Sequence, residues 1–222
     1  GTVGRRHWGQ RWGQHWGQHW GQHWGATLGG GMARQDALHS DGWLDGVRRV
    51  ASPHFGERPD GNVIDLLVIH NISLPPGEFG GPWVEQLFCG QLDPTAHPYF
   101  AAVAGSPVSA HLFIRRDGET LQFVDLWQRA WHAGRSCWQG RAECNDYGIG
   151  IELEGTDDTP FTDVQYLRLA RVTRQIMRRF PAITPERIVG HSDVAPGRKT
   201  DPGPAFDWAR YRGLLAAAAQ ED

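Results

Sequence analysis

Length, composition and charge limit the classes of protein to consider. The chain has 222 residues, 40% of them hydrophobic, which suffices for one well-buried domain and not for two large ones. Lys and Arg number 22 against 25 Asp and Glu, the formal net charge is -3, and the sequence has no basic run. This balance lacks the electrostatic footprint of a nucleic-acid or anionic-membrane partner, so we expect neither.

Cysteine usage and hydropathy bear on the compartment. The three cysteines, Cys89, Cys137 and Cys144, are an odd number without a CxxC pair, which fits neither a disulfide framework nor a four-thiolate zinc site. No stretch approaches the roughly 18 apolar residues that span a bilayer, and the first residues lack the short apolar core of a secretory signal. We therefore expect a cytoplasmic protein, and we treat it as a monomer.

Residues 1–31 differ from the rest of the chain, because HWGQ recurs there with a period of four. The regularly spaced imidazoles, which are His7, His15, His19 and His23, could bind copper, zinc or nickel. A repeat with Gly in every unit buries no core, however, and the chain begins with Gly while Met32 opens an ordinary sequence. We favour a disordered extension or a start-site artefact and place the folded domain at residues 41–215.

Two segments before residue 125 have strand patterns. The run VIDLLVI at 63–69 is continuous, apolar and rich in β-branched residues, which predicts a buried central strand. His70 follows it directly and precedes a segment whose Pro and Gly content forbids regular structure, so we expect His70 at a strand end facing a loop. HLFIRRDGETLQFV at 111–124 predicts two strands around a turn at Asp117 and Gly118.

The segment YGIGIELEG at 147–155 predicts a further strand. Its Ile and Leu residues alternate with Gly and Glu, which is the period of a strand with two different faces. Successive side chains point to opposite sides of a sheet, so Glu152 and Glu154 share the face opposite the Ile and Leu residues.

The remaining elements complete a mixed fold. Thr162 and Gln165 have the spacing of a capping box, and apolar residues recur after them at intervals of three and four, which predicts an amphipathic helix that Pro181 ends. A short strand at 187–190 and a last helix at about 206–219 follow, separated by a long irregular loop rich in Gly and Pro. The pattern predicts an α/β or α+β fold with a mixed central β-sheet flanked by helices.

Three polar residues stand at or beyond predicted strand ends in segments rich in Gly and Pro, and these are His70, His191 and Asp201. Three nitrogen or oxygen ligands are the usual protein complement of a catalytic zinc ion. Taken singly, a histidine in a domain of this size is more often a structural residue, and an aspartate in such a loop is more often a turn former. Spacing alone therefore leaves the zinc site open.

Four longer motifs shift this balance: LLVIHNISLPPGEFGGP, VSAHLFIRRDGE, CNDYGIGIELEGTD and GHSDVAPGRKTDPGPAFDW. They resemble, in the same order, the AmpD-type N-acetylmuramoyl-L-alanine amidases of bacterial cell-wall recycling, and the likeness covers about 42–212. It implies the fold of the wider superfamily, which includes peptidoglycan recognition proteins: a mixed sheet with flanking helices and a zinc cleft. Family members often carry arginines where this chain has Pro107 and residues 142–143, which puts an arginine clamp on the substrate's carboxylates in question.

The resemblance also assigns roles residue by residue. It implies that His70, His191 and Asp201 hold one Zn²⁺ per chain, an ion that lowers the pKa of water toward about 7 and polarises a carbonyl. It assigns the general base to Glu152 and oxyanion stabilisation to Lys199. Composition supports the last assignment, because Lys199 is the only lysine among the 22 basic residues.

Other residues have less specific signals. Glu154 points the same way as the predicted general base and is interpreted as structural. Asn71 and Trp131 are the predicted substrate-binding residues, because an amide suits a peptide backbone and an aromatic face suits a sugar ring, although a core Trp is the alternative. His111 and His132 either orient the zinc ligands or are structural histidines.

The function that the resemblance implies is zinc-dependent hydrolysis of the amide between (1,6-anhydro)-N-acetylmuramic acid and L-alanine. The substrate would be an anhydromuropeptide, and the setting would be cytoplasmic peptidoglycan recycling, with lower levels of the muropeptides that induce β-lactamase. Three other interpretations remain open: a non-catalytic peptidoglycan-recognition module, a secreted or periplasmic amidase that acts on the intact wall, and a metal-storing or metal-sensing protein built on the HWGQ repeat. Fold alone does not separate them.

Overall fold

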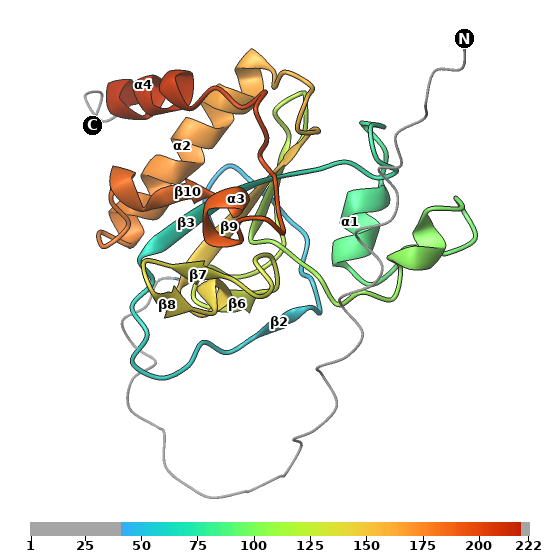
Figure 1. The fold of residues 1–222 in the computed structure, drawn as a ribbon, viewed down its shortest axis with the longest axis horizontal. Helices are drawn as coiled ribbons and strands as arrows, with labels where there is room; N and C mark the ends of the chain where they lie inside the picture. Colours follow the sequence, from blue (N-terminus) through green and yellow to red (C-terminus); the bar gives the residue numbers. More distant parts are fainter. Residues whose placement is uncertain (1–40, 219–222) are drawn as a thin grey trace, which may run out of the picture.

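A six-stranded mixed sheet lies at the centre of residues 41–218, the part of the chain that this computed structural model describes (Figure 1). Its strands follow the order β1-β5-β4-β9-β3-β10. They are β1 (Arg48–Arg49), β3 (Leu66–Ile72), β4 (Leu112–Ile114), β5 (Thr120–Gln122), β9 (Gly148–Glu154) and β10 (Ile188–Gly190). Smaller sheets pair β2 (Phe55–Gly56) with β6 (Arg129–Ala130) and β7 (Cys137–Trp138) with β8 (Arg141–Ala142).

Helices flank this sheet. They are α1 (Trp83–Phe88), α2 (Asp163–Arg179), α3 (His191–Val194) and α4 (Trp208–Ala218), with short 3-10 turns η1 (Phe100–Ala102), η2 (Cys144–Asp146) and η3 (Pro185–Arg187). Figure 1 shows α2 and α4 lying together, with α1 on its own at the other side of the sheet. Among the described residues, no helix is long and apolar enough to cross a membrane.

The strand pairing confirms the predicted fold class. β3 pairs in parallel with both β9 and β10, and β4 pairs in parallel with β9. β4 and β5 are antiparallel and form the predicted hairpin around Asp117 and Gly118, where Gly118 has a φ of 87° that favours glycine. The sheet is therefore mixed, as the alternation of strands and helices indicates.

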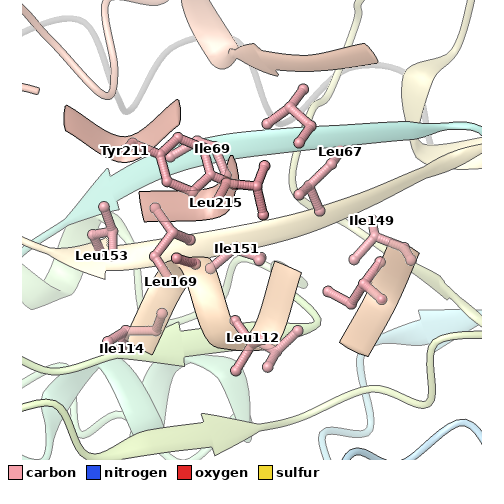
Figure 2. Packing of buried hydrophobic residues seen from close by; sticks show 14 of the residues in the cluster. Leu67, Ile69, Leu112, Ile114, Ile149, Ile151, Leu153, Leu169, Tyr211 and Leu215 are labelled. Atoms are coloured by element: carbon pink, nitrogen blue, oxygen red, sulfur yellow. The ribbon is translucent and has the colours of Figure 1, made fainter. Parts of the chain in front are cut away.

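One face of β3 and β9 forms the main hydrophobic core against α2 and α4 (Figure 2). The buried side chains on this face include Leu67, Ile69, Ile149, Ile151, Leu153, Leu169, Tyr211 and Leu215. Each buried Leu or Ile contributes about 1.5–3 kcal/mol relative to an exposed one, so this face holds the strands firmly in register. The alternate residues of the same strands, His70 and Glu152 among them, point away from α2.

The opposite side of the sheet has two further clusters. One packs the segment around α1 against β4 and β5 and includes Leu74, Val84, Leu87, Phe88, Phe100, Phe113, Leu121 and Phe123. The other surrounds the alternate face of β3 and includes Leu66, Val68, Ala133, Cys144, Tyr147, Val189 and Val194. Apolar packing therefore surrounds the strand face that carries His70.

Helix α2 begins as predicted. The Thr162 hydroxyl accepts from the Gln165 N–H at 3.2 Å, and the Gln165 side chain accepts from the Thr162 N–H at 3.0 Å, which completes a capping box. The Gln165 amide also donates to the carbonyl of Glu154 at the end of β9. The cap thus provides a hydrogen-bond acceptor for an N–H group in the first turn of the helix and also attaches the helix to the sheet.

Two predicted boundaries were wrong. The central strand begins at Leu66 rather than at Val63, which is 59% exposed, because β9 begins at Gly148 opposite Leu66 and leaves the preceding residues without a strand to pair with. It also continues to Ile72, so His70 lies inside the strand and not at its end.

The segment expected to be an irregular loop after β10 contains the short helix α3. Its first turn is stabilised by Asp193, whose carboxylate accepts from the Gly190 N–H at 2.7 Å. Helix α4 lies where the last helix was predicted. The prediction for residues 1–31 lies outside the described residues.

Candidate metal centre and active site

Two histidines and an aspartate meet in one buried group. Asp201 Oδ2 lies 3.0 Å from His70 Nδ1 and 3.0 Å from His191 Nδ1, and these two nitrogens are also 3.0 Å apart. The exposed fractions of His70, His191 and Asp201 are 1%, 3% and 7%. Their potential ligand atoms all lie within 4.8 Å of one another, so a single metal ion can contact all three.

Adjacent elements bring these three residues together. His70 lies in β3 on the face away from α2, and β10 is the parallel neighbour of β3. His191 directly follows β10 and begins α3, which places it beside His70. The Ser192 N–H donates to the Asp201 carbonyl at 3.0 Å, and this bond fixes the returning loop against the start of the helix.

The far nitrogens of both imidazoles have partners inside the protein. His70 Nε2 lies 3.0 Å from His132 Nδ1, and His191 Nε2 lies 3.0 Å from the Ala133 carbonyl oxygen. When a histidine ligand donates its far N–H to such an acceptor, the near nitrogen is left with a free lone pair. Both Nδ1 atoms are thus arranged to face a metal ion together with a carboxylate oxygen.

The protonation states suit the same purpose. Burial lowers the pKa of His70 to about 4, and the neighbouring His191 adds to this effect. In the metal-free protein, burial opposes ionisation of Asp201, but hydrogen bonds from His191 and His70 outweigh it and hold the pKa of this carboxyl well below its ordinary value. A neutral imidazole and an ionised carboxylate are the metal-binding forms of these groups. The donor set therefore fits a divalent metal ion.

Glu152 lies beside this group. It is the register partner of His70 across the β3–β9 pair, so both side chains rise from the same face of the sheet. Its Oε2 atom is buried and has no hydrogen-bond partner among the described residues. Burial, and then the negative charge of Asp201, raise the pKa of Glu152 well above its ordinary value, while Lys199 acts in the opposite direction. Carboxyls with a pKa raised by burial and a neighbouring charge are characteristic of proton-transfer sites.

Lys199 brings the positive charge of the site. The backbone N–H of Lys199 donates to the Ala195 carbonyl at 3.0 Å, which fixes the chain at the end of the α3 turn. Burial lowers the pKa of Lys199, Arg198 adds to this, and the negative charges of Asp201 and Glu152 oppose it. The structure thus brings together the three predicted ligand residues, the predicted general base and the lysine that the sequence singled out. Their catalytic roles stay predictions.

The predicted substrate-binding residues have partners within the protein. Asn71 Nδ2 donates to Asp157 Oδ1 at 2.8 Å and to the Pro202 carbonyl at 3.1 Å, which ties the end of β3 to the loop that contains Asp201. Trp131 is partly buried beneath the Arg129 guanidinium, 4.4 Å from its ring centroid. Contact of either residue with a substrate stays a prediction.

Glu154 has the structural role expected of it. Its carboxylate accepts from the Gly80 N–H at 2.5 Å and from the Arg116 N–H at 3.0 Å, and the side chain is only 3% exposed. It therefore fastens the loop after β3 to the sheet and does not point into the metal group.

Sequence reasoning missed Arg58 and left His111 undecided. Arg58 is a partly buried arginine that donates to the backbone carbonyls of Leu126, Trp127, Asn145 and Gly148. Its Nη2 atom also lies 3.2 Å from His111 Nε2, and His111 Nδ1 accepts from the Gly150 N–H. No local pattern marks Arg58, since each of its partners lies far along the chain.

The fold and the site together define an α/β protein with a buried group of two histidines and one aspartate able to hold a metal ion, an arrangement typical of metal-dependent hydrolases. Comparison with known proteins agrees, because the family model for N-acetylmuramoyl-L-alanine amidase matches residues 60–204. The chain belongs to this amidase family, and the match spans all five residues of the proposed catalytic group.

Two similar proteins align with this chain over nearly their whole length. The 1,6-anhydro-N-acetylmuramyl-L-alanine amidase AmpD of Escherichia coli is 60% identical over 179 residues, which are 81% of this chain and 97% of that protein. The AmpD of Citrobacter freundii is 57% identical over 185 residues, 83% of this chain and 98% of that protein.

Solved structures extend the likeness to the fold. A crystal structure of an AmpD derivative superimposes with a TM-score of 0.77 at 60% identity and covers 80% of this chain and 99% of that one. The amidase AmiD of E. coli, in complex with anhydro-N-acetylmuramic acid-L-Ala-D-γ-Glu-L-Lys, gives a TM-score of 0.52 at 28% identity, covering 71% of this chain and 60% of that one. These likenesses confirm the resemblance inferred from the motifs.

Proposed function

We propose that this protein is a zinc-dependent amidase that cleaves the bond between (1,6-anhydro)-N-acetylmuramic acid and the L-alanine of muropeptides, in cytoplasmic peptidoglycan recycling. The catalytic domain would comprise residues 41–215 and hold one zinc ion per chain. The observation that carries the proposal is the buried group of His70, His191 and Asp201 with Glu152 in register beside it. The names of relatives that are 57–60% identical support the choice of substrate.

Bound zinc supplies Lewis acidity, which polarises an amide carbonyl and lowers the pKa of a nearby water molecule. His70, His191 and Asp201 would hold the ion through Nδ1, Nδ1 and Oδ2. Glu152 would accept a proton from the attacking water and pass it to the L-alanine nitrogen as the C–N bond breaks. The products are the lactyl carboxylate of the sugar and the free amino group of the peptide.

Lys199 would stabilise the negative charge that develops on the carbonyl oxygen during attack. A partly buried ammonium already close to the charges of Asp201 and Glu152 needs little rearrangement to do so. Positive charge also favours the anionic form of Glu152, since Lys199 lowers the pKa of that carboxyl against the effect of burial. One lysine would thus stabilise both the ionised form of the base and the negative charge on the carbonyl oxygen.

Hydrolysis of anhydromuramoyl tripeptide by the purified 222-residue chain tests this proposal, with intact peptidoglycan assayed in parallel. Chelator-sensitive release of the peptide from the anhydro sugar, restored by added Zn²⁺ and absent in Glu152→Ala, would support it. Binding of the tripeptide by zinc-loaded protein without turnover would instead favour a recognition module. Faster release from intact peptidoglycan than from the tripeptide would favour an amidase of the intact wall.

A further inference from the structure

A two-residue segment lies directly behind both histidines of the metal group. It consists of His132 and Ala133, which follow β6 in the chain and lie 62 and 58 residues away in sequence from the histidines they contact. The His132 ring contacts His70 at a centroid distance of 5.1 Å in an edge-on arrangement. The Ala133 carbonyl contacts His191. Consecutive residues thus support the two imidazoles from the side opposite Asp201.

The hydrogen bond between His70 and His132 has only one possible donor when His70 is a metal ligand. A neutral imidazole that offers Nδ1 to a metal carries its hydrogen on Nε2 and must donate from there. His70 Nε2 lies 3.0 Å from His132 Nδ1, so His132 must accept and must carry its own hydrogen on Nε2. The reverse direction would place a hydrogen on His70 Nδ1, where it points at His191 and Asp201 and blocks ligation.

In the contact between His191 and Ala133, the metal-ligand histidine is again the donor. His191 Nε2 lies 3.0 Å from the Ala133 carbonyl oxygen, which can only accept, so His191 Nδ1 is left to face Asp201. The same carbonyl accepts from Arg198 Nη2 at 2.6 Å. Since a carbonyl oxygen has two lone pairs, Ala133 is satisfied by these two donors.

One buried side chain fixes the backbone of both residues. Asn145 Oδ1 accepts from the His132 N–H at 3.2 Å and from the Ala133 N–H at 2.8 Å, and Asn145 itself is 7% exposed within η2. The ring of His132 occupies space that only a glycine leaves open, because a Cβ on Gly150 in β9 would overlap it. The segment is therefore held from its backbone and confined at its side chain.

We propose that the segment His132–Ala133, clamped by Asn145, is a positioning element that sets the tautomer and orientation of both histidine ligands. Asn145 would then control metal affinity although it contacts neither ligand. The inference rests on the proposed function in assuming that the group binds zinc. Partners of this kind typically change metal affinity by about 10- to 100-fold when they are removed.

Zinc affinity of the 222-residue chain, measured by competition with a chromogenic chelator at a fixed pH, tests the positioning element. His132→Leu leaves the His70 Nε2–H without an acceptor, and Asn145→Ala frees the backbone of the segment, so each should weaken zinc binding by about 10- to 100-fold. His132→Asn presents an oxygen near the position of Nδ1 and should restore most of the lost affinity. Matched controls are His54→Leu and Asn62→Ala, whose side chains bond to Val108 O and to Arg141 instead.

A second measurement does not depend on any variant folding. The imidazole ¹⁵N spectrum of the zinc-loaded, unaltered protein should show His132 protonated at Nε2 and unprotonated at Nδ1. A hydrogen on His132 Nδ1 would overturn the proposal, as would His132→Leu and Asn145→Ala variants that bind zinc as tightly as their controls. Failure of the unaltered protein to bind zinc would instead overturn the proposed function. Melting temperatures of the metal-free variants separate lost affinity from lost folding.

Discussion

His70 and Glu152 are direct register partners on the parallel strands β3 and β9, and their side chains rise from the same face of the sheet. A predicted metal ligand and a predicted proton acceptor are therefore fixed by backbone hydrogen bonds rather than by loops. The opposite face of the same strands is packed against α2 and α4. Such a site needs little reorganisation during a reaction, which is the condition under which electrostatic catalysis is strongest.

Glu152→Gln should lower kcat by about 100- to 10,000-fold, because the amide retains the shape of the side chain and cannot accept a proton. Zinc content should stay unchanged, since Glu152 is not among the three ligand residues. Turnover of anhydromuramoyl tripeptide and metal analysis of the same sample check both statements. Glu57→Gln, at an exposed glutamate, is the matched control. Unimpaired turnover in Glu152→Gln would refute its role as the base.

Lys199→Met should lower kcat by about 100-fold, equivalent to about 3 kcal/mol of transition-state stabilisation, while KM changes little. The methionine keeps the unbranched shape of the side chain, ends one atom earlier and removes its charge. Lys199→Arg should recover part of the rate, because it restores the positive charge. A rise in KM with an unchanged kcat would assign Lys199 to substrate binding rather than to the oxyanion.

Glu154→Ala should destabilise the protein by about 1–3 kcal/mol, because two N–H groups lose the buried carboxylate that accepts from them. Those donors are the backbone amides of Gly80 and Arg116. Glu78→Ala, an exposed glutamate in the same loop, should stay within about 0.5 kcal/mol of the unaltered protein. Urea unfolding of the metal-free proteins measures both, and equal effects would show that Glu154 does not anchor the loop.

Acid should destabilise the metal-free protein through His111. Burial, together with the positive charge of Arg58 and the nearby His70, lowers the pKa of His111 from its ordinary 6.5 to about 3. The unfolded chain therefore binds a proton below pH 6.5 that the folded protein does not bind until about pH 3, and stability falls as the pH is lowered across this window. The slope from one such histidine is at most about 1.4 kcal/mol per pH unit.

Urea unfolding at several pH values between 6.5 and 4.5 measures that slope in the unaltered protein and in His111→Gln. His132 and His70, which neighbour His111, contribute to the slope in both proteins, so the difference between the two isolates His111. We expect the shallower slope in His111→Gln. Equal slopes would mean that His111 is protonated in the folded state at these pH values.

Elements set by local sequence were predictable. Helix α2 follows from a capping box and a periodic apolar stripe within a single segment, and the β4–β5 hairpin follows from its turn. The start of β3 was not predictable in this way, because it depends on where β9 begins, more than 80 residues later in the chain. Strand ends set by a distant partner leave no mark in the strand itself.

The candidate site was likewise only partly predictable from the sequence. His70 lies 121 residues from His191 and 131 from Asp201, so spacing alone left the metal group open, and the resemblance to a known family identified it. Arg58 had no such signal, and Asn145 lies in a motif of the resemblance that assigned it no role. Both residues act through bonds to backbone groups of other segments. Substrate contacts of Asn71 and Trp131 stay predictions that a bound ligand must test.

The alternation along β9 restricts how this enzyme family can change. Insertion of a single residue early in β9 would exchange the two faces of the strand, bringing Ile151 to the metal group and sending the Glu152 carboxylate into the core beside Leu169. One event would remove the base and destabilise the fold together. A one-residue shift in β9 is therefore strongly disfavoured, while the loops around the metal group are less constrained in length.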